Sequence, residues 1–132
     1  MTALHHVQVS CPKGGEPAVS RFYADLLGLV EVAKPSELAK RGGVWFRGDG
    51  YELHVGVETP FLPAAKAHPA FLVDDVDELA AQLTCAGCKV TWDSNFPGYR
   101  RFHTRDPHGN RVELLGVELL GQASSSASTG GI

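Results

Sequence analysis

The sequence has few cysteines, no long apolar run and no excess of one charge. Its three cysteines are an odd number and follow no signal-peptide pattern, which argues against a disulfide framework. No stretch approaches the roughly 20 apolar residues of a membrane-spanning helix. The formal net charge of −3, with both signs mixed along the chain, lacks the basic footprint of a nucleic-acid or membrane-surface binder. We therefore expect a cytoplasmic protein that binds neither nucleic acid nor membrane.

Cys85 and Cys88 form a C-x-x-C pair, which is a pattern of redox and zinc sites. The pair falls at the end of an expected helix, and the sequence has neither a second C-x-x-C nor a glycine-rich zinc ribbon around it. We interpret both thiols, and Cys11, as small apolar packing residues.

The chain is long enough for a sizeable core. Its 132 residues, 43% of them hydrophobic, predict one compact domain over residues 1–120. Residues 121–132 are rich in glycine and serine and carry no core-forming pattern, so we expect a flexible tail without a catalytic role.

The segment 106–115, DPHGNRVELL, combines a tight turn with a strand that contains a carboxylate. The Asp-Pro-His-Gly-Asn sequence is typical of a turn, and alternation in the following strand sends Val112 and Leu114 into a core. Glu113 then points to the other face. A carboxylate among apolar residues is costly to bury unless it is paired, hydrogen-bonded or bound to a metal, whereas a Glu on the wet face of a sheet needs no such partner.

The two halves of the chain repeat one order of elements: strand, helix, strand, then two more strands. An Asp-Gly turn between apolar runs predicts a hairpin in the first half, and Asp75 with Glu78 predicts a capping box in the second. The expected strands are 4–10, 29–32, 43–48, 51–57, 68–75, 89–92, one within 96–104, and one from 110 onward, and the expected helices are 16–27 and 76–86.

Ligand-type residues occupy equivalent places in the two halves. His6 and His68 open the halves, and Glu52 and Glu113 close them inside similar Glu-Leu pairs. His54 is an alternative to Glu52, because it follows Gly50 by the same number of residues as Glu113 follows Gly109. Imidazole and carboxylate groups at matched positions are typical of a metal site.

The segments LHHVQVS, RFYADLLGL, HPAFLVDDVDEL and DPHGNRVELL resemble the vicinal oxygen chelate superfamily, also called the glyoxalase/bleomycin-resistance/dioxygenase superfamily. The resemblance covers about residues 4–118. It implies an α+β fold of two βαβββ modules, about 3–58 and about 67–118, whose curved mixed sheets surround a shared cleft. It also implies a homodimer, a habit of this superfamily.

The resemblance implies a divalent metal site built from the first and last strands of each module. Carried over by position, the ligands are His6, Glu52 or His54, His68 and Glu113. Ligand type alone does not choose among Zn, Ni, Fe, Mn and Co. In such a site Glu113 and Glu52 are also the candidate catalytic bases, because a displaced carboxylate ligand can accept a proton.

Several residues around this site are candidates for substrate binding. Alternation in the strand near residue 100 sends one of two arginines, Arg101 in our interpretation, toward a small-molecule substrate. The list is completed by one histidine and three aromatic residues that could line a pocket: His103, Tyr99, Trp45 and Trp92.

These residues predict a metal-dependent glyoxalase-like enzyme, a lyase, isomerase or epimerase acting on a small oxygenated substrate chelated at the metal. Lactoylglutathione-lyase-like and extradiol-dioxygenase activities use much the same ligands. The alternative is a metal-free protein of the bleomycin-resistance type that binds and sequesters a drug. Such binders commonly lack the ligand set, which this chain retains.

Overall fold

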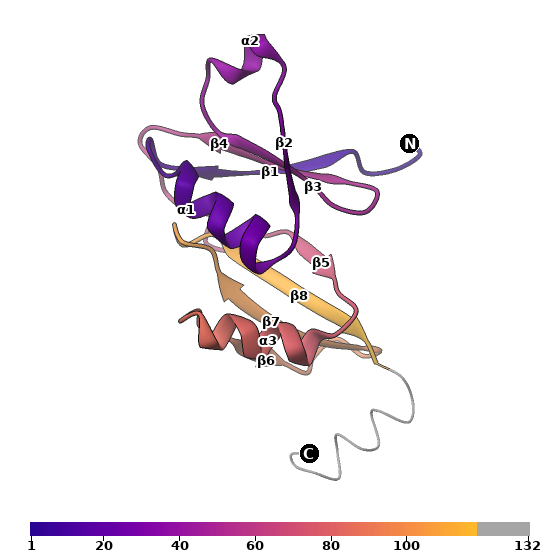
Figure 1. The fold of residues 1–132 in the computed structure, drawn as a ribbon. Helices are drawn as coiled ribbons and strands as arrows, with labels where there is room; N and C mark the ends of the chain where they lie inside the picture. Colours follow the sequence, from indigo (N-terminus) through magenta and orange to yellow (C-terminus); the bar gives the residue numbers. More distant parts are fainter. Residues whose placement is uncertain (119–132) are drawn as a thin grey trace. The chain divides into compact units, whose positions relative to one another are not determined.

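The computed structural model describes residues 1–118, and they form eight strands and a few short helices (Figure 1). The expected tail 121–132 lies outside the described residues. The helices are α1 (Glu16–Ser20), its π-helical continuation (Arg21–Leu26), α2 (Ser36–Ala39) and α3 (Val76–Cys85). The strands are β1 (His6–Cys11), β2 (Val30–Val32), β3 (Val44–Arg47), β4 (Glu52–Val57), β5 (Ala70–Leu72), β6 (Thr91–Asp93), β7 (Tyr99–Arg105) and β8 (Arg111–Val117).

The strands form two four-stranded sheets with the same topology. The orders are β1-β4-β3-β2 and β5-β8-β7-β6, and in each sheet the first pair is parallel. A parallel pair requires a crossover connection, which includes a helix in both halves. The pairs β2/β3, β3/β4 and β6/β7 are antiparallel, so both sheets are mixed. The α+β prediction with a repeated order of elements is confirmed.

The contacts divide the chain into two units that do not follow the sequence order strictly. The first contains residues 1–69 and 105–112, and the second contains residues 70–104 and the chain from Glu113 onward. The expected limits of the modules and of the domain stay predictions. Among residues 1–118, no helix has the length and apolarity that a membrane crossing demands.

The core of the first unit follows from alternation in β4 and from the helix that begins at Glu16. Leu53 and Val55 are at most 1% exposed, as expected for side chains on the inner face of a strand. Tyr23 and Phe46 are fully buried with ring centroids 5.7 Å apart. The expected continuous helix 16–27 becomes π-helical after Ser20, and Gly28 follows it with a φ of +81°, which glycine adopts without strain.

The second unit has its core between α3 and the central strands of its sheet. The side chain of Asp75 accepts a hydrogen bond from the Glu78 backbone N–H at 3.0 Å, which confirms the predicted start of the helix. Leu83 on the helix, Phe102 on β7 and Leu114 on β8 are almost completely buried.

The turn before β8 is held by the buried carboxylate of Asp106, and this turn belongs to the first unit. Its Oδ1 accepts the backbone N–H groups of His108 and Asn110 at 2.9 and 3.0 Å. Its Oδ2 accepts the Tyr23 hydroxyl and the Asn110 side-chain amide, each at 2.8 Å. The same amide donates to the carbonyl of Ser10 in β1 at 2.7 Å. The predicted turn is confirmed, and it is anchored to both a helix and a strand.

Candidate functional site

The carboxylate of Glu113 lies on β8 with only 4% of the residue exposed. Val112 and Leu114 on either side of it are buried against the core, as alternation predicts. The Glu therefore faces a second enclosed environment rather than solvent. Such a carboxylate needs compensating partners, and the neighbouring strand β7 supplies two of them.

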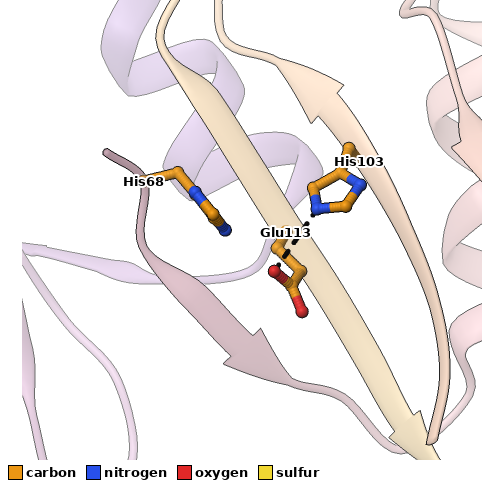
Figure 2. A group of neighbouring side chains, drawn as sticks. All are labelled: His68, His103 and Glu113. Carbon is orange, nitrogen blue, oxygen red and sulfur yellow. Dashed lines mark ion pairs between the residues drawn. The ribbon is translucent and has the colours of Figure 1, made fainter. Parts of the chain in front are cut away.

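Three ligand-type side chains converge around this carboxylate (Figure 2). One potential ligand atom from each of His68, His103 and Glu113 lies within 4.8 Å of the other two. Figure 2 shows the two imidazole rings on either side of Glu113. His103 Nε2 is 3.3 Å from Glu113 Oε1. His68 lies on the segment that leads into β5, two residues before Ala70, which pairs with Glu113.

The orientation of His68 is set by a backbone hydrogen bond. Its Nδ1 is 2.8 Å from the carbonyl oxygen of Lys66. A carbonyl only accepts, so Nδ1 carries the proton and Nε2 of the neutral ring carries the lone pair. This arrangement is the one that presents a histidine to a metal ion, because the second nitrogen fixes both tautomer and ring orientation.

Glu113 is also paired with a cation. Arg101 on β7 donates from one terminal nitrogen to Glu113 Oε2 at 3.0 Å and from the other to Asp93 Oδ2 at 3.1 Å. The hydrogen bond to Glu113 raises the pKa of Arg101 above its ordinary value. The backbone N–H of Asn95 holds the pKa of Asp93 below its ordinary value. Two carboxylates thus share one guanidinium, and their excess negative charge favours a further cation.

The donor set fits a divalent transition metal. Ligand atoms around such an ion lie about 3–3.5 Å apart, because bonds of about 2.0–2.2 Å meet at angles of about 90–110°. Separations of up to 4.8 Å are wider than this, so binding of an ion would draw the three side chains closer together. Arg101 holds Oε2, so Oε1 is the oxygen of Glu113 that faces the histidines.

The predicted substrate residues of the second unit lie beside this cluster. A hollow of about 220 Å³ is lined by nine residues, among them Trp92, Phe96, Tyr99 and Arg101. The Phe96 and Tyr99 rings are 4.7 Å apart between centroids, and the Arg101 guanidinium lies 5.3 Å from the Phe96 centroid. The Arg100 guanidinium, 4.0 Å from the Trp92 centroid, pairs with Asp77 at 2.7 Å instead.

The first unit brings its own predicted site residues together. The buried ring of His54 is stacked between Trp45 at 3.8 Å and His6 at 4.0 Å, measured between ring centroids. His54 Nε2 is 2.9 Å from Glu52 Oε1, and this hydrogen bond holds the pKa of Glu52 below its ordinary value. His5 precedes β1, is exposed, and lies 2.9 Å from His6 through their Nδ1 atoms.

Glu52 also borders a hollow of about 430 Å³ in the first unit. His5, Arg47 and Tyr51 line the same hollow, and Arg47 Nε lies 3.9 Å from Glu52 Oε2. The side chain of Glu52 is 22% exposed, compared with 5% for His54. Of these two neighbours on β4, the carboxylate is therefore the one that a dissolved molecule can reach.

The sequence alone places His103 among the substrate-binding residues, whereas in the structure its ring belongs to the group of three potential metal ligands. Asp93, the second partner of Arg101, was not among the predicted site residues. The available signal was weak: His103 shares a face of its strand with Arg101, but alternation does not state which residue of β8 stands opposite. The predicted residues fall into two groups, one on strands β1, β3 and β4, and the other on strands β6, β7 and β8 together with His68, which directly precedes β5.

Comparisons with known proteins agree with this fold. The model of the Glyoxalase/Bleomycin resistance protein/Dioxygenase superfamily matches residues 4–114. A solved protein from Bacillus anthracis, assigned to the glyoxalase family, is 43% identical with a TM-score of 0.85, over 89% of this chain and 96% of that one. No match was found among curated proteins.

Two more distant structures share the fold. Lactoylglutathione lyase from Agrobacterium tumefaciens is 23% identical with a TM-score of 0.69, over 88% of this chain and 94% of that one. An antibiotic-binding protein from Streptomyces is 24% identical with a TM-score of 0.68, over 89% and 98% respectively. The same fold thus serves both an enzyme and a binder.

Proposed function

Because the chain belongs to the glyoxalase/bleomycin resistance protein/dioxygenase superfamily, we propose that it is a metal-dependent enzyme of the glyoxalase type. Its reaction is that of a lyase, isomerase or epimerase on a small oxygenated substrate. The observation that carries this proposal is the convergence of His68, His103 and Glu113 on one point. Two imidazoles and one carboxylate suit a first-row transition metal better than Mg²⁺ or Ca²⁺, which prefer oxygen ligands.

A divalent ion held by these residues supplies a Lewis acid that stabilises the negative charge developing on substrate oxygens. The residues of the chain orient this centre. The Lys66 carbonyl fixes the ring of His68, and Arg101 fixes the carboxylate of Glu113. The aromatic rings of Phe96 and Tyr99 line the hollow next to Arg101.

Glu113 and Glu52 are the proposed proton acceptors. Glu113 Oε1 lies at the point where the three potential ligand atoms converge, so a carboxylate displaced from the ion there could accept a proton from the substrate. Glu52 has the greater access to solvent and borders the larger hollow. The hydrogen bond from His54 keeps Glu52 in its ionised form, which is the form that accepts a proton.

Metal content of untagged protein tests the proposal. We expect about one equivalent of a transition metal in the wild type and its loss in His68→Ala and Glu113→Gln. The matched control is His108→Gln, because the His108 ring bonds to the Gly15 carbonyl and lies outside the ligand cluster. Equal metal content in all four proteins contradicts the proposal.

The same set of ligands supports a second candidate, an extradiol dioxygenase. Two histidines and one carboxylate are the ligand types of many non-haem Fe(II) oxygenases. Protein loaded with Fe(II) without oxygen, then mixed with a catechol and air, distinguishes the two. Formation of a yellow ring-opened product favours the dioxygenase.

The alternative is a protein that binds and sequesters an antibiotic and catalyses no reaction. The aromatic lining of the hollow favours it, and the Streptomyces relative in fold is an antibiotic binder. The volume of about 220 Å³ is below the roughly 300–1,000 Å³ of drug-sized pockets, which favours a smaller ligand. Recovery of an intact drug from metal-free protein supports sequestration. The predicted homodimer is tested separately by light scattering.

A further inference from the structure

A row of charged side chains crosses the sheet of the second unit and ends at Glu113. Asp93 on β6 is the strand partner of Arg101 on β7, and the Arg101 side chain reaches Glu113 on β8. The exposed fractions of these three side chains are 27%, 17% and 5%, from Asp93 to Glu113. Two carboxylates therefore divide one guanidinium in a setting where solvent screens the charges only in part.

The guanidinium of Arg101 gives one terminal nitrogen to each carboxylate. Nη1 donates to Glu113 Oε2 at 3.0 Å, and Nη2 donates to Asp93 Oδ2 at 3.1 Å. The remaining nitrogen, Nε, is buried and has no hydrogen-bond partner among residues 1–118. Arg101 thus has a spare donor close to a carboxylate that it already contacts through Nη1.

Asp93 opposes a closer pairing of Arg101 with Glu113. A guanidinium and a carboxylate frequently form a bidentate pair, in which two N–H groups occupy both oxygens. Asp93 engages Nη2 and so draws the guanidinium toward β6. The carboxylate of Asp93 is itself oriented, because the backbone N–H of Asn95 donates to its other oxygen, Oδ1, at 2.8 Å.

We propose that Asp93 is a positioning residue of the candidate metal site. By engaging Nη2 of Arg101, it keeps the guanidinium from closing on both oxygens of Glu113, so that Oε1 remains the ligand atom for the ion. The inference rests on the proposed function, because it gives Asp93 a role toward the same ion. Without Asp93, the guanidinium and the ion compete for Oε1.

The charges of the row act in the same direction as the geometry. Asp93 and Glu113 carry two negative charges against the one positive charge of Arg101, which leaves an excess of one negative charge. Removal of Asp93 cancels this excess and leaves the arginine cation near the position of the ion, where like charges repel. Geometry and charge therefore both predict weaker binding of the ion without Asp93.

Titration of the metal-free full chain with Co(II), followed through the visible absorption of the bound ion, tests this role. We expect Asp93→Ala to weaken Co(II) binding about 10–100-fold, the usual effect of losing a residue that orients a ligand. Asp93→Asn keeps a hydrogen-bond acceptor without the charge and should lose less. The matched control is Asp77→Ala, because Asp77 pairs with the adjacent Arg100 at 2.7 Å; this variant should bind Co(II) as the wild type does.

A second substitution separates positioning from a merely structural role. In Arg101→Met no guanidinium competes for Glu113, so the addition of Asp93→Ala should change the Co(II) affinity by no more than about threefold. An equal loss with and without Arg101 overturns the inference, and so does wild-type affinity in Asp93→Ala. Near-ultraviolet circular dichroism checks the fold of each variant.

A crystal structure of metal-free Asp93→Ala supplies a readout that needs no ion. Arg101 should contact both oxygens of Glu113 there, and an unchanged contact to Oε2 alone overturns the inference. If His103→Gln loses Co(II) while Asp93→Ala binds it like the wild type, the inference fails and the proposed function stands. If the wild type binds no Co(II), both fail.

Discussion

Replacing Tyr23 by Phe should destabilise the protein at neutral pH and stabilise it, relative to the wild type, above about pH 11. The Tyr23 hydroxyl donates to Asp106 Oδ2 at 2.8 Å in a fully buried position. A hydrogen bond to a carboxylate contributes about 1.5–3 kcal/mol. Asp106 Oδ2 keeps the Asn110 amide as a donor, so the loss should lie near the lower end, at about 1.5–2 kcal/mol.

The effect of Tyr23→Phe on stability changes sign with pH, because the pKa of Tyr23 is raised well above its ordinary value. Burial is the larger cause, and the negative charge of Asp106 is the second. A group with a raised folded pKa contributes its full stability below its unfolded pKa, near pH 10 for tyrosine, and loses it as the pH rises further. Ionisation of the unfolded tyrosine then costs the wild type about 1.4 kcal/mol per pH unit. The two curves should therefore cross between about pH 11 and 11.5.

Urea unfolding of both proteins at several pH values between 8 and 11.5 measures this difference. In thermal unfolding at pH 8, the melting temperature of the variant should be roughly 6–8 °C lower than that of the wild type, at about 4 °C per kcal/mol for a chain of this size. A difference in unfolding free energy that stays constant up to pH 11.5 refutes the raised pKa. A difference below about 0.5 kcal/mol at pH 8 refutes the contribution of the hydrogen bond.

Three other substitutions test the packing and the charges. Gly43→Ala should lower the free energy of unfolding, measured in urea, by at least about 2 kcal/mol, because φ is +89° and the added Cβ would clash with the backbone carbonyl oxygen of Val55 in β4. Gly50→Ala is the comparison: its φ is +83° but a Cβ there meets open space, so the loss should be smaller. Arg101→Met should lower the melting temperature of the metal-free protein, because it removes the guanidinium that pairs with the buried Glu113 carboxylate. A second substitution, Glu113→Gln, removes the negative charge as well and should restore most of the loss. Glu16→Gln should reduce the loss of stability at acid pH. The backbone N–H of Gly43 holds the pKa of Glu16 below its ordinary value in the folded protein. The ionised Glu16 therefore stabilises the fold above its unfolded pKa, and this stabilisation is lost as the pH falls through its folded pKa.

The sequence predicted those features that depend on local chemistry. Residues 106–110 have turn chemistry, and the turn is present with Asp106 at its centre. Alternation placed Leu53 and Leu114 in the core and Glu113 away from it, and the structure agrees. These features need only the preferences of neighbouring residues, so one strand or turn at a time is enough to predict them.

Features that depend on pairing between strands were beyond the sequence. Alternation gives the face of His103 but not its neighbour across the sheet, so its approach to Glu113 was missed. The sequence leaves Glu52 and His54 as alternatives for the same reason, because both lie on one face of β4 and stand two positions apart, opposite His6 and Gln8 of β1.

The division of the first unit between residues 1–69 and 105–112 has a consequence for synthesis of the chain. The buried Tyr23 hydroxyl and the Ser10 carbonyl receive their partners only when Asp106 and Asn110 have been translated. At about 5–20 residues per second, the ribosome needs roughly 2–7 s to translate residues 70–104, which separate the first segment from the second. During that interval the nascent first unit has no partners for these groups. A run of slow codons between residues 70 and 104 lengthens this interval and should increase aggregation of the nascent chain.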